Sequence, residues 1–261
     1  MSDKSIEGIS LKVGPLGEND RLLTFLSDQN GITRIAVPGA RRPSSKLGGA
    51  TPLTHLKLQL VGKRELKRVK HLKILKSYCN LSKDFETLSA GQAIAELCLL
   101  LVAGNDPIPG LVSTVLIHLD RLEETDKTIE DPSLLTLAKS IQSCIHLIAL
   151  GGYGLPLQNC CISGLRLEPP IGNWDWRCSL IPDEGFGIGS SAKSAIELNP
   201  SELALLQRLL NPNLPINANG ELMGPKRVWL RLLTVLECWI ENHLSRKLSS
   251  LMMLRESIIN Y

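Results

Sequence analysis

Residues 8–50 read GISLKVGPLGENDRLLTFLSDQNGITRIAVPGARRPSSKLGGA, and this stretch decides the fold of the N-terminal part of the chain. Apolar residues alternate with polar ones from Ile9 and Leu11 onward, which is the period of a β-strand with one buried face. Two further apolar runs, residues 21–27 and 31–37, flank an Asn-Gly pair, a strong hairpin signal. The stretch therefore predicts three consecutive strands joined by turns.

Two more strand patterns follow. Leu56, Leu58 and Leu60 alternate with polar residues, and residues 69–78 give a fifth pattern of the same kind. Five short strands within about eighty residues, with a long connection after the third, predict a five-stranded OB-fold barrel. An SH3-like barrel fits the pattern almost as well.

The apolar spacing changes to that of helices after Asp84. Residues 153–197 lose all periodicity and read as an irregular insertion. Elsewhere we expect helices through residues 85–102, 111–119, 132–150 and 203–210, and a last one over residues 226–255. The sequence thus predicts an α+β protein, with a barrel domain over residues 1–80 and a mostly α-helical domain over residues 81–261.

Basic charge is concentrated in the barrel domain. Residues 1–80 hold 15 of the 29 Lys and Arg residues and only 6 of the 26 Asp and Glu residues, a net charge of +9. Residues 81–261 carry a net charge of −6, so the overall +3 hides a strong asymmetry. Such an asymmetry is typical of a protein that binds a polyanion.

Several short motifs match a known pattern. They are LGENDRL at residues 16–22, VPGARR at 37–42, KLGG at 46–49, WIENHL at 239–244 and RKLSSL at 246–251. Together they closely resemble the RecO family of bacterial recombinational repair proteins over essentially the whole chain. The resemblance implies an N-terminal OB-fold, a helical domain and, in many members, a small zinc-binding insertion. It also implies DNA binding, annealing of complementary single strands, and partnership with RecR and single-stranded-DNA-binding protein.

The candidate DNA contacts are basic residues of the barrel domain, because phosphate neutralisation supplies most of the affinity for a nucleic-acid backbone. The competing interpretation is an ordinary solvated face. The loop group consists of Arg41, Arg42 and Lys46, and a weaker second group consists of Lys63, Arg64 and Lys67. Two strand residues, Arg21 and Arg34, are further candidates if their side chains point outward.

Aromatic residues are scarce in the same domain, which contains only Phe25 and Tyr78. Binders of single strands usually stack bases on several aromatic side chains. We therefore expect binding through backbone electrostatics, sensitive to salt and able to take single-stranded DNA and also double-stranded DNA. This mode suits annealing, since the bases must stay free to pair.

The insertion departs from the zinc pattern of the family. Zinc-bearing relatives place one CxxC pair after the central helices and a second pair before the next helix. Residues 160–163 read CCIS, and residues 185–192 contain no Cys, which leaves Cys178 as the only other thiol of the insertion. Because a structural zinc site needs four ligands, we expect a degenerate zinc-finger-like insertion, no metal and no cofactor.

Enzyme signatures do not occur in the chain, which has no Walker A motif, no HExxH and no GxSxG. We therefore expect a non-enzymatic DNA-binding mediator of recombinational repair. Two alternatives remain open from the residues alone. One is an RNA-binding accessory factor on the same barrel, and the other is a hydrolase that uses the Gly-rich residues 185–189.

The resemblance implies that the acidic, aromatic-tipped tail of single-stranded-DNA-binding protein docks on the helical domain. Such a tail needs an apolar pocket and nearby cations. Two clusters supply cations, and the sequence does not choose between them: Arg121 with Lys139, and Lys226 with Arg227 and Arg231.

The cellular compartment follows from composition. Seven Cys residues without framework spacing indicate free thiols in a reducing compartment. The first residues, MSDK, give no secretory signal, and the apolar run over residues 97–103 is too short to span a bilayer. We expect a soluble, cytoplasmic, nucleoid-associated protein that does not bind membranes.

Overall fold

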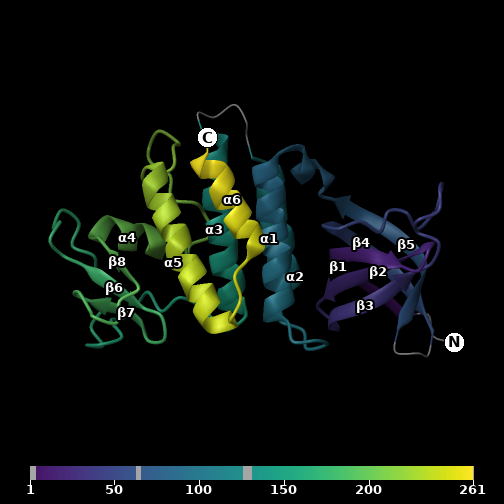
Figure 1. The fold of residues 1–261 in the computed structure, drawn as a ribbon, viewed down its shortest axis with the longest axis horizontal. Coiled ribbons are helices and arrows are strands. Elements are labelled where there is room, and N and C mark those ends of the chain that lie inside the picture. Colours follow the sequence, from purple (N-terminus) through teal and green to yellow (C-terminus); the bar gives the residue numbers. More distant parts are fainter. Residues whose placement is uncertain (1–3, 63–65, 126–130, 261) are drawn as a thin grey trace. The chain divides into compact units, whose positions relative to one another are not determined.

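The computed structural model describes residues 4–62, 66–125 and 131–260. They fall into two compact units, residues 1–124 and residues 125–261 (Figure 1). The barrel ends close to residue 80, where the sequence places a domain boundary. The two helices that follow belong to the same compact unit as the barrel, so that boundary stays a prediction.

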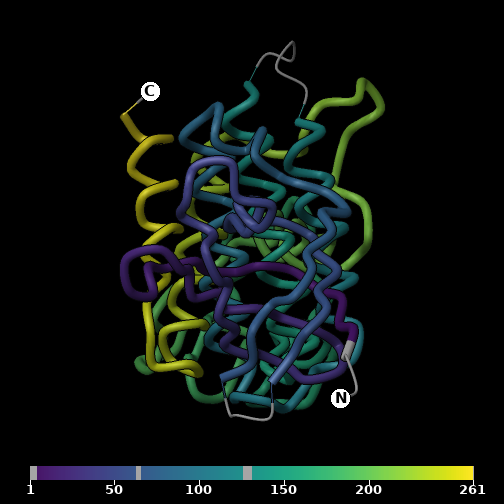
Figure 2. The backbone as a smooth tube through the Cα atoms, turned by 90° about the vertical axis from the view of Figure 1, so that its right-hand side faces the viewer, coloured from purple at the N-terminus to yellow at the C-terminus, as the bar shows by residue number. Residues whose placement is uncertain are grey.

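Five strands form a closed barrel in the first unit (Figures 1 and 2, purple to blue): β1 (Lys4–Leu16), β2 (Asp20–Ser27), β3 (Gly31–Val37), β4 (Thr54–Val61) and β5 (Lys67–Ser77). Their order around the barrel is β1-β2-β3-β5-β4, and β4 closes on β1. Neighbouring strands are antiparallel except β3 and β5, which meet briefly in parallel. This topology is the OB-fold, which confirms the first of the two barrels that the sequence allows.

The strand β4 shows how the sequence fills the barrel. Leu56, Leu58 and Leu60 point into the core and are at most 3% exposed. Lys57 and Gln59, between them in sequence, are exposed on the outside. The alternation predicted from the sequence is therefore confirmed, and the outer face of β4 is left to polar residues.

A 3-10 helix and two α-helices complete the first unit: η1 (Cys79–Lys83), α1 (Phe85–Leu101) and α2 (Leu111–Glu123). The side chain of Asp120 joins α2 to β5. Its Oδ1 accepts hydrogen bonds of 2.7 Å from both the Lys76 ammonium and the Tyr78 hydroxyl. Glu123 Oε2 lies 3.2 Å from the same ammonium group.

The loop between α1 and α2 packs against the start of β3. Ile32 N donates to Gly104 O at 2.8 Å. A Cβ on Gly31, whose φ is +55°, would lie 2.9 Å from the same oxygen. Only glycine at this position allows the loop to come so close, and the contact brings Asn105 to the edge of the barrel.

The second unit contains four helices and a small sheet among its described residues: α3 (Pro132–Leu150), β6 (Cys178–Ile181), β7 (Gly185–Ile188), β8 (Ile196–Leu198), α4 (Pro200–Arg208), α5 (Lys226–Leu244) and α6 (Ser249–Ile259). The helix α3 packs against α5 and α6. By length and composition α3 could cross a membrane, but 61% of its most apolar window is buried inside the protein. Burial of this extent is typical of a helix in the core of a folded domain.

Two expectations for this unit are wrong. The predicted last helix over residues 226–255 is two helices, because Ser245 adopts a left-handed φ of 54° after Leu244. Leu248 and Leu251 are buried beyond the break. The apolar pattern therefore continues through a turn that it does not reveal.

The insertion is the second correction. The sequence predicts an irregular segment over residues 153–197, yet these residues contain most of an antiparallel sheet with the order β7-β6-β8. Its strands have four, four and three residues. Runs this short leave no measurable period in the sequence.

Candidate nucleic-acid interface

Residues 38–50, called the basic loop below, form a series of tight turns at the barrel. Ala40 and Ala50 are buried in the barrel core, and Leu47 packs against it. Successive turns close through backbone bonds of 3.0–3.2 Å: Arg42 N to Gly39 O, Ser45 N to Arg42 O, and Gly48 N to Ser45 O. The backbone of the basic loop is therefore held in place by the barrel core and by its own hydrogen bonds, and this fixes the Cα positions of its exposed side chains.

Two side chains at the start of β2 hold this loop in place. Arg21 Nη1 donates to Gly48 O at 3.1 Å and to Ala50 O at 2.9 Å. Asp20 Oδ1 accepts from Gly39 N at 2.8 Å. Arg21, a candidate DNA contact in the sequence, is half-buried and bonded to the loop that carries other candidates.

The three loop cations differ in their bonding. Arg41 Nη1 donates to Gly17 O at 3.0 Å, in the turn between β1 and β2. Arg42 and Lys46 are exposed, and neither meets an acidic side chain among the residues that the structure describes. The loop therefore offers two unpaired cations and a third that is anchored at the end of β1.

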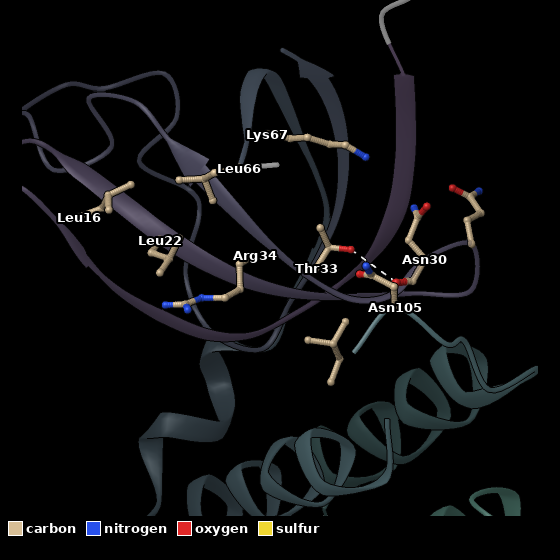
Figure 3. A pocket seen from close by; sticks show the side chains of 10 residues that line it. Leu16, Leu22, Asn30, Thr33, Arg34, Leu66, Lys67 and Asn105 are labelled. Carbon is tan, nitrogen blue, oxygen red and sulfur yellow. Dashed lines mark hydrogen bonds between the residues drawn. The ribbon is translucent and has the colours of Figure 1, made fainter. Parts of the chain in front are cut away.

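A groove of about 700 Å³ runs along the outside of β2 and β3 (Figure 3). Leu22 and Arg34 lie on one side of it, and Leu66 and Lys67 on the other. Its lining is apolar, amide-bearing and basic: Leu16, Leu22, Gln29, Asn30, Ile32, Thr33, Arg34, Leu66, Lys67 and Asn105. Of these lining residues only Arg34 and Lys67 are charged, so the groove is cationic.

Both groove cations are available to a ligand. Arg34 is exposed on the outer side of β3, which meets the condition under which the sequence analysis made it a candidate DNA contact. Lys67 is half-buried at the start of β5. Neither has an ion pair with another described residue. Lys63 and Arg64, the other members of the second predicted group, lie outside the described residues.

The basic loop and the groove adjoin each other. Leu16 lines one end of the groove, and Gly17, the next residue, accepts the Arg41 hydrogen bond. A backbone leaving the groove at this end would meet the cations of the loop. The structure thus brings Arg34, Lys67 and Arg41 to one continuous surface.

The two aromatic residues of the barrel do not contribute to this surface. Phe25 is 0% exposed and Tyr78 is 3% exposed. Bases in the groove would meet the aliphatic side chains of Leu16, Leu22 and Leu66 in place of aromatic rings. The sequence-based expectation of a site without stacking platforms fits this geometry.

The groove contains residues that the sequence analysis did not single out. Asn105 comes from the loop after α1, far from the strands in sequence, and no periodic signal links it to them. Leu22 of β2 and Ile32 of β3 are half-buried apolar residues of the groove, four register positions apart on neighbouring strands. An apolar residue at a position that alternation assigns to solvent is the one signal that could have identified them.

The helical candidates are also unequal. The Arg231 guanidinium lies 3.2 Å from the Glu202 carboxylate and also donates to the backbone oxygen of Glu197. Lys226 and Arg227 stand in the first turn of α5, which contains no acidic residue. A helix N-terminus disfavours cations, so these two side chains are poorly compensated by their own helix.

An apolar groove of about 260 Å³ lies beside that turn, between α4 and the start of α5. Its walls include Ala204, Leu205, Pro225 and Val228, and Arg208 is the one charged residue among those that line it. The other predicted cluster is divided between the units. Arg121 is on α2 in the first unit, whereas Lys139 is on α3 in the second and donates to Thr125 Oγ1 at 3.0 Å.

The insertion does not offer a zinc donor set. Cys160 Sγ accepts backbone N–H groups from Ser163 at 3.4 Å and Ile188 at 3.2 Å. Burial raises the pKa of Cys160, but hydrogen bonds from Ser163 and the backbone lower it more, to about 7. No group of three or more His, Cys, Asp or Glu residues in the described parts of the chain is arranged to hold a metal ion. These residues do not supply the four ligands that a structural zinc site needs.

The barrel topology and the cationic groove on β2 and β3 define an OB-fold protein, which here has a second, helical unit. The family model "Recombination protein O N terminal" matches residues 1–78, and "Recombination protein O C terminal" matches residues 82–252. Together these matches span nearly the whole chain.

Individual relatives agree with the family models. The DNA repair protein RecO of Prochlorococcus marinus (strain MIT 9303) is 60% identical over 258 residues, covering 99% of this chain and 97% of its own. RecO of Synechococcus sp. (strain WH7803) is 56% identical, covering 98% of this chain and 95% of its own. RecO of Trichodesmium erythraeum is 30% identical, covering 93% of this chain and 90% of its own. The chain belongs to the RecO family of DNA repair proteins.

Proposed function

We propose that this protein binds single-stranded DNA in the groove of its barrel and promotes annealing of complementary strands, without catalysing a covalent reaction. The observation that carries the proposal is the groove on β2 and β3, where Arg34 and Lys67 face a ligand without a carboxylate beside them. Strands β2 and β3 form the ligand-binding face of OB-folds. Membership in a family of DNA repair proteins supports DNA as the polyanion.

The arrangement suits annealing in particular. The phosphates of a strand lie against Arg34, Lys67 and, at the Leu16 end, the cations of the basic loop. Without aromatic platforms, the bases are held weakly and can leave to pair with a second strand. Neutralised phosphates also lower the repulsion between two approaching polyanions.

Partner binding is proposed for the helical unit. The acidic tail of single-stranded-DNA-binding protein fits the apolar groove between α4 and α5, where Arg208, Lys226 and Arg227 can meet its carboxylates. Arg231 contributes less, because Glu202 already neutralises it. Partnership with RecR and a cytoplasmic, nucleoid-associated location rest on family membership alone.

The test is an annealing assay on complementary DNA strands coated with single-stranded-DNA-binding protein. We expect the wild-type protein to accelerate annealing and Arg34→Glu/Lys67→Glu to lose most of that acceleration. The same assay with RNA strands measures the alternative of an RNA-binding factor. Faster annealing of RNA than of DNA, or an unaffected groove variant, would contradict the proposal.

A further inference from the structure

A second cationic surface occupies the outer face of β4 and β5, centred on residues that belong neither to the groove lining nor to the basic loop. Lys57 of β4 and Lys73 of β5 are register partners in the antiparallel ladder, and both are exposed. The next outward pair is Gln59 with His71, and both of these are exposed as well. These two pairs make this part of the surface polar and positively charged.

The pairing of Lys57 with Lys73 is unfavourable for the barrel itself. Like charges directly opposite each other in a ladder are destabilising. Glu7 lies opposite Lys57 on its other side, but the Glu7 carboxylate is 3.2 Å from His55 Nε2. Neither lysine has an ion pair with any residue in the described parts of the chain. The two charges are thus left for something outside the barrel.

The centre of this surface is separate from the groove, which reaches β5 only at its first residue, Lys67. In the order β1-β2-β3-β5-β4, the strand β4 is separated from β2 by β1 and from β3 by β5. Lys70, also exposed, stands at the bulge where Gln59 pairs with His71 and Leu60 pairs with Val69. A strand that lies along β2 and β3 leaves this second surface uncovered.

We propose that the outer face of β4 and β5, centred on Lys57 and Lys73, binds the sugar-phosphate backbone of a second DNA strand. This inference rests on the proposed function, in which the groove holds the first strand. Strands β4 and β5 contain no Phe, Tyr or Trp, so the face suits phosphates and leaves the bases free. Holding two flexible strands on one barrel raises their effective concentration for each other, which accelerates pairing without a new contact.

The experiment compares three variants with the wild-type protein. Lys57→Gln/Lys73→Gln removes two charges, and Lys12→Gln/Lys83→Gln removes two from exposed positions elsewhere in the same unit. Lys57→Glu makes the same change in net charge with one substitution, and the new acid lies opposite both Lys73 and Glu7. Two measurements are made for each: the number of non-complementary oligonucleotides bound per chain, and the annealing rate at dilute, equal strand concentrations.

We expect two strands per chain for the wild-type protein and Lys12→Gln/Lys83→Gln, and one for both Lys57 variants. The annealing rate should fall about tenfold in the Lys57 variants, since tethering of the second strand is lost. Affinity for the first strand should change less than about twofold.

Two outcomes would overturn the inference while leaving the proposed function intact. One is annealing at the wild-type rate by both Lys57 variants, and the other is two non-complementary strands still bound per chain by both variants. A wild-type protein that neither binds nor anneals DNA would overturn both proposals together. These results separate the failure of the second surface from the failure of the groove.

Discussion

The basic loop and the groove are neighbouring regions of one barrel, and both contain cations that the sequence offers as DNA contacts. In and around the loop, Arg21 and Arg41 donate to backbone oxygens and build the structure. In the groove, Arg34 and Lys67 have no such bonds to described residues and face an open surface. Charge counting gives the sign of a domain's potential, but the hydrogen-bond partners decide which cations can meet a phosphate.

The largest effect should separate the two regions in DNA binding. We expect Arg34→Glu/Lys67→Glu to weaken single-strand binding at least about tenfold, because each charge-assisted bond is worth about 1.5–3 kcal/mol. The log–log salt slope should also fall by about 1.4, or about 0.7 per lost phosphate contact. The matched loop variant Arg42→Glu/Lys46→Glu should lose less affinity, because these two cations, although unpaired, lie outside the groove. Fluorescence anisotropy across a salt series measures both, and equal losses would remove the distinction between the regions.

The second effect reverses the comparison and concerns stability. Arg21→Ala should lower the free energy of unfolding by about 1–3 kcal/mol, because two carbonyl groups of the basic loop lose their donor. Arg34→Ala, on the neighbouring strand, should stay within about 0.5 kcal/mol of wild type. Urea unfolding gives both values. A larger loss of stability for Arg34→Ala than for Arg21→Ala would contradict the structural role given to Arg21.

A smaller effect concerns the contact between β5 and α2. Charged side chains form ion pairs at this contact, unlike the cations of the groove. Burial raises the pKa of Asp120, but hydrogen bonds from Lys76 and Tyr78 lower it more, so the net shift is downward. A lowered carboxyl pKa stabilises the fold above its unfolded value of about 3.9, and this stability is lost as the pH falls through the folded pKa. We expect Asp120→Asn to flatten the acid limb of stability below about pH 4. An unchanged acid limb would show that this contact does not contribute.

The smallest effect is expected in the insertion, where the thiol of Cys160 is already bonded to backbone N–H groups. Treatment with a metal chelator should leave the melting temperature unchanged, because the residues present do not form a four-ligand site. Elemental analysis of the dialysed protein provides the second readout. One zinc per chain, with a lower melting temperature after chelation, would contradict this expectation.

The sequence predicts the barrel well because β4 alternates strictly, so the pattern and the pleat agree there. It fails at Ser245, where the turn between α5 and α6 keeps the apolar positions in step with a continuous helix. It also fails in the insertion, whose strands are too short for a period. For the site, composition identifies the basic domain, but the bonds of Arg21 and Arg41 reach residues distant in sequence. The groove depends on Asn105, which only the folded chain brings to β3.

The most direct test of the groove is lysine acetylation, mapped by mass spectrometry, with and without one oligo(dT) strand of about fifteen nucleotides per chain. Lys67 lines the groove, whereas Lys83 is exposed on η1 of the same unit and serves as the internal control. We predict that DNA slows acetylation of Lys67 several-fold and leaves Lys83 unchanged. Acetylation of Lys67 at the DNA-free rate, in protein shown to be saturated with the strand, would contradict the account.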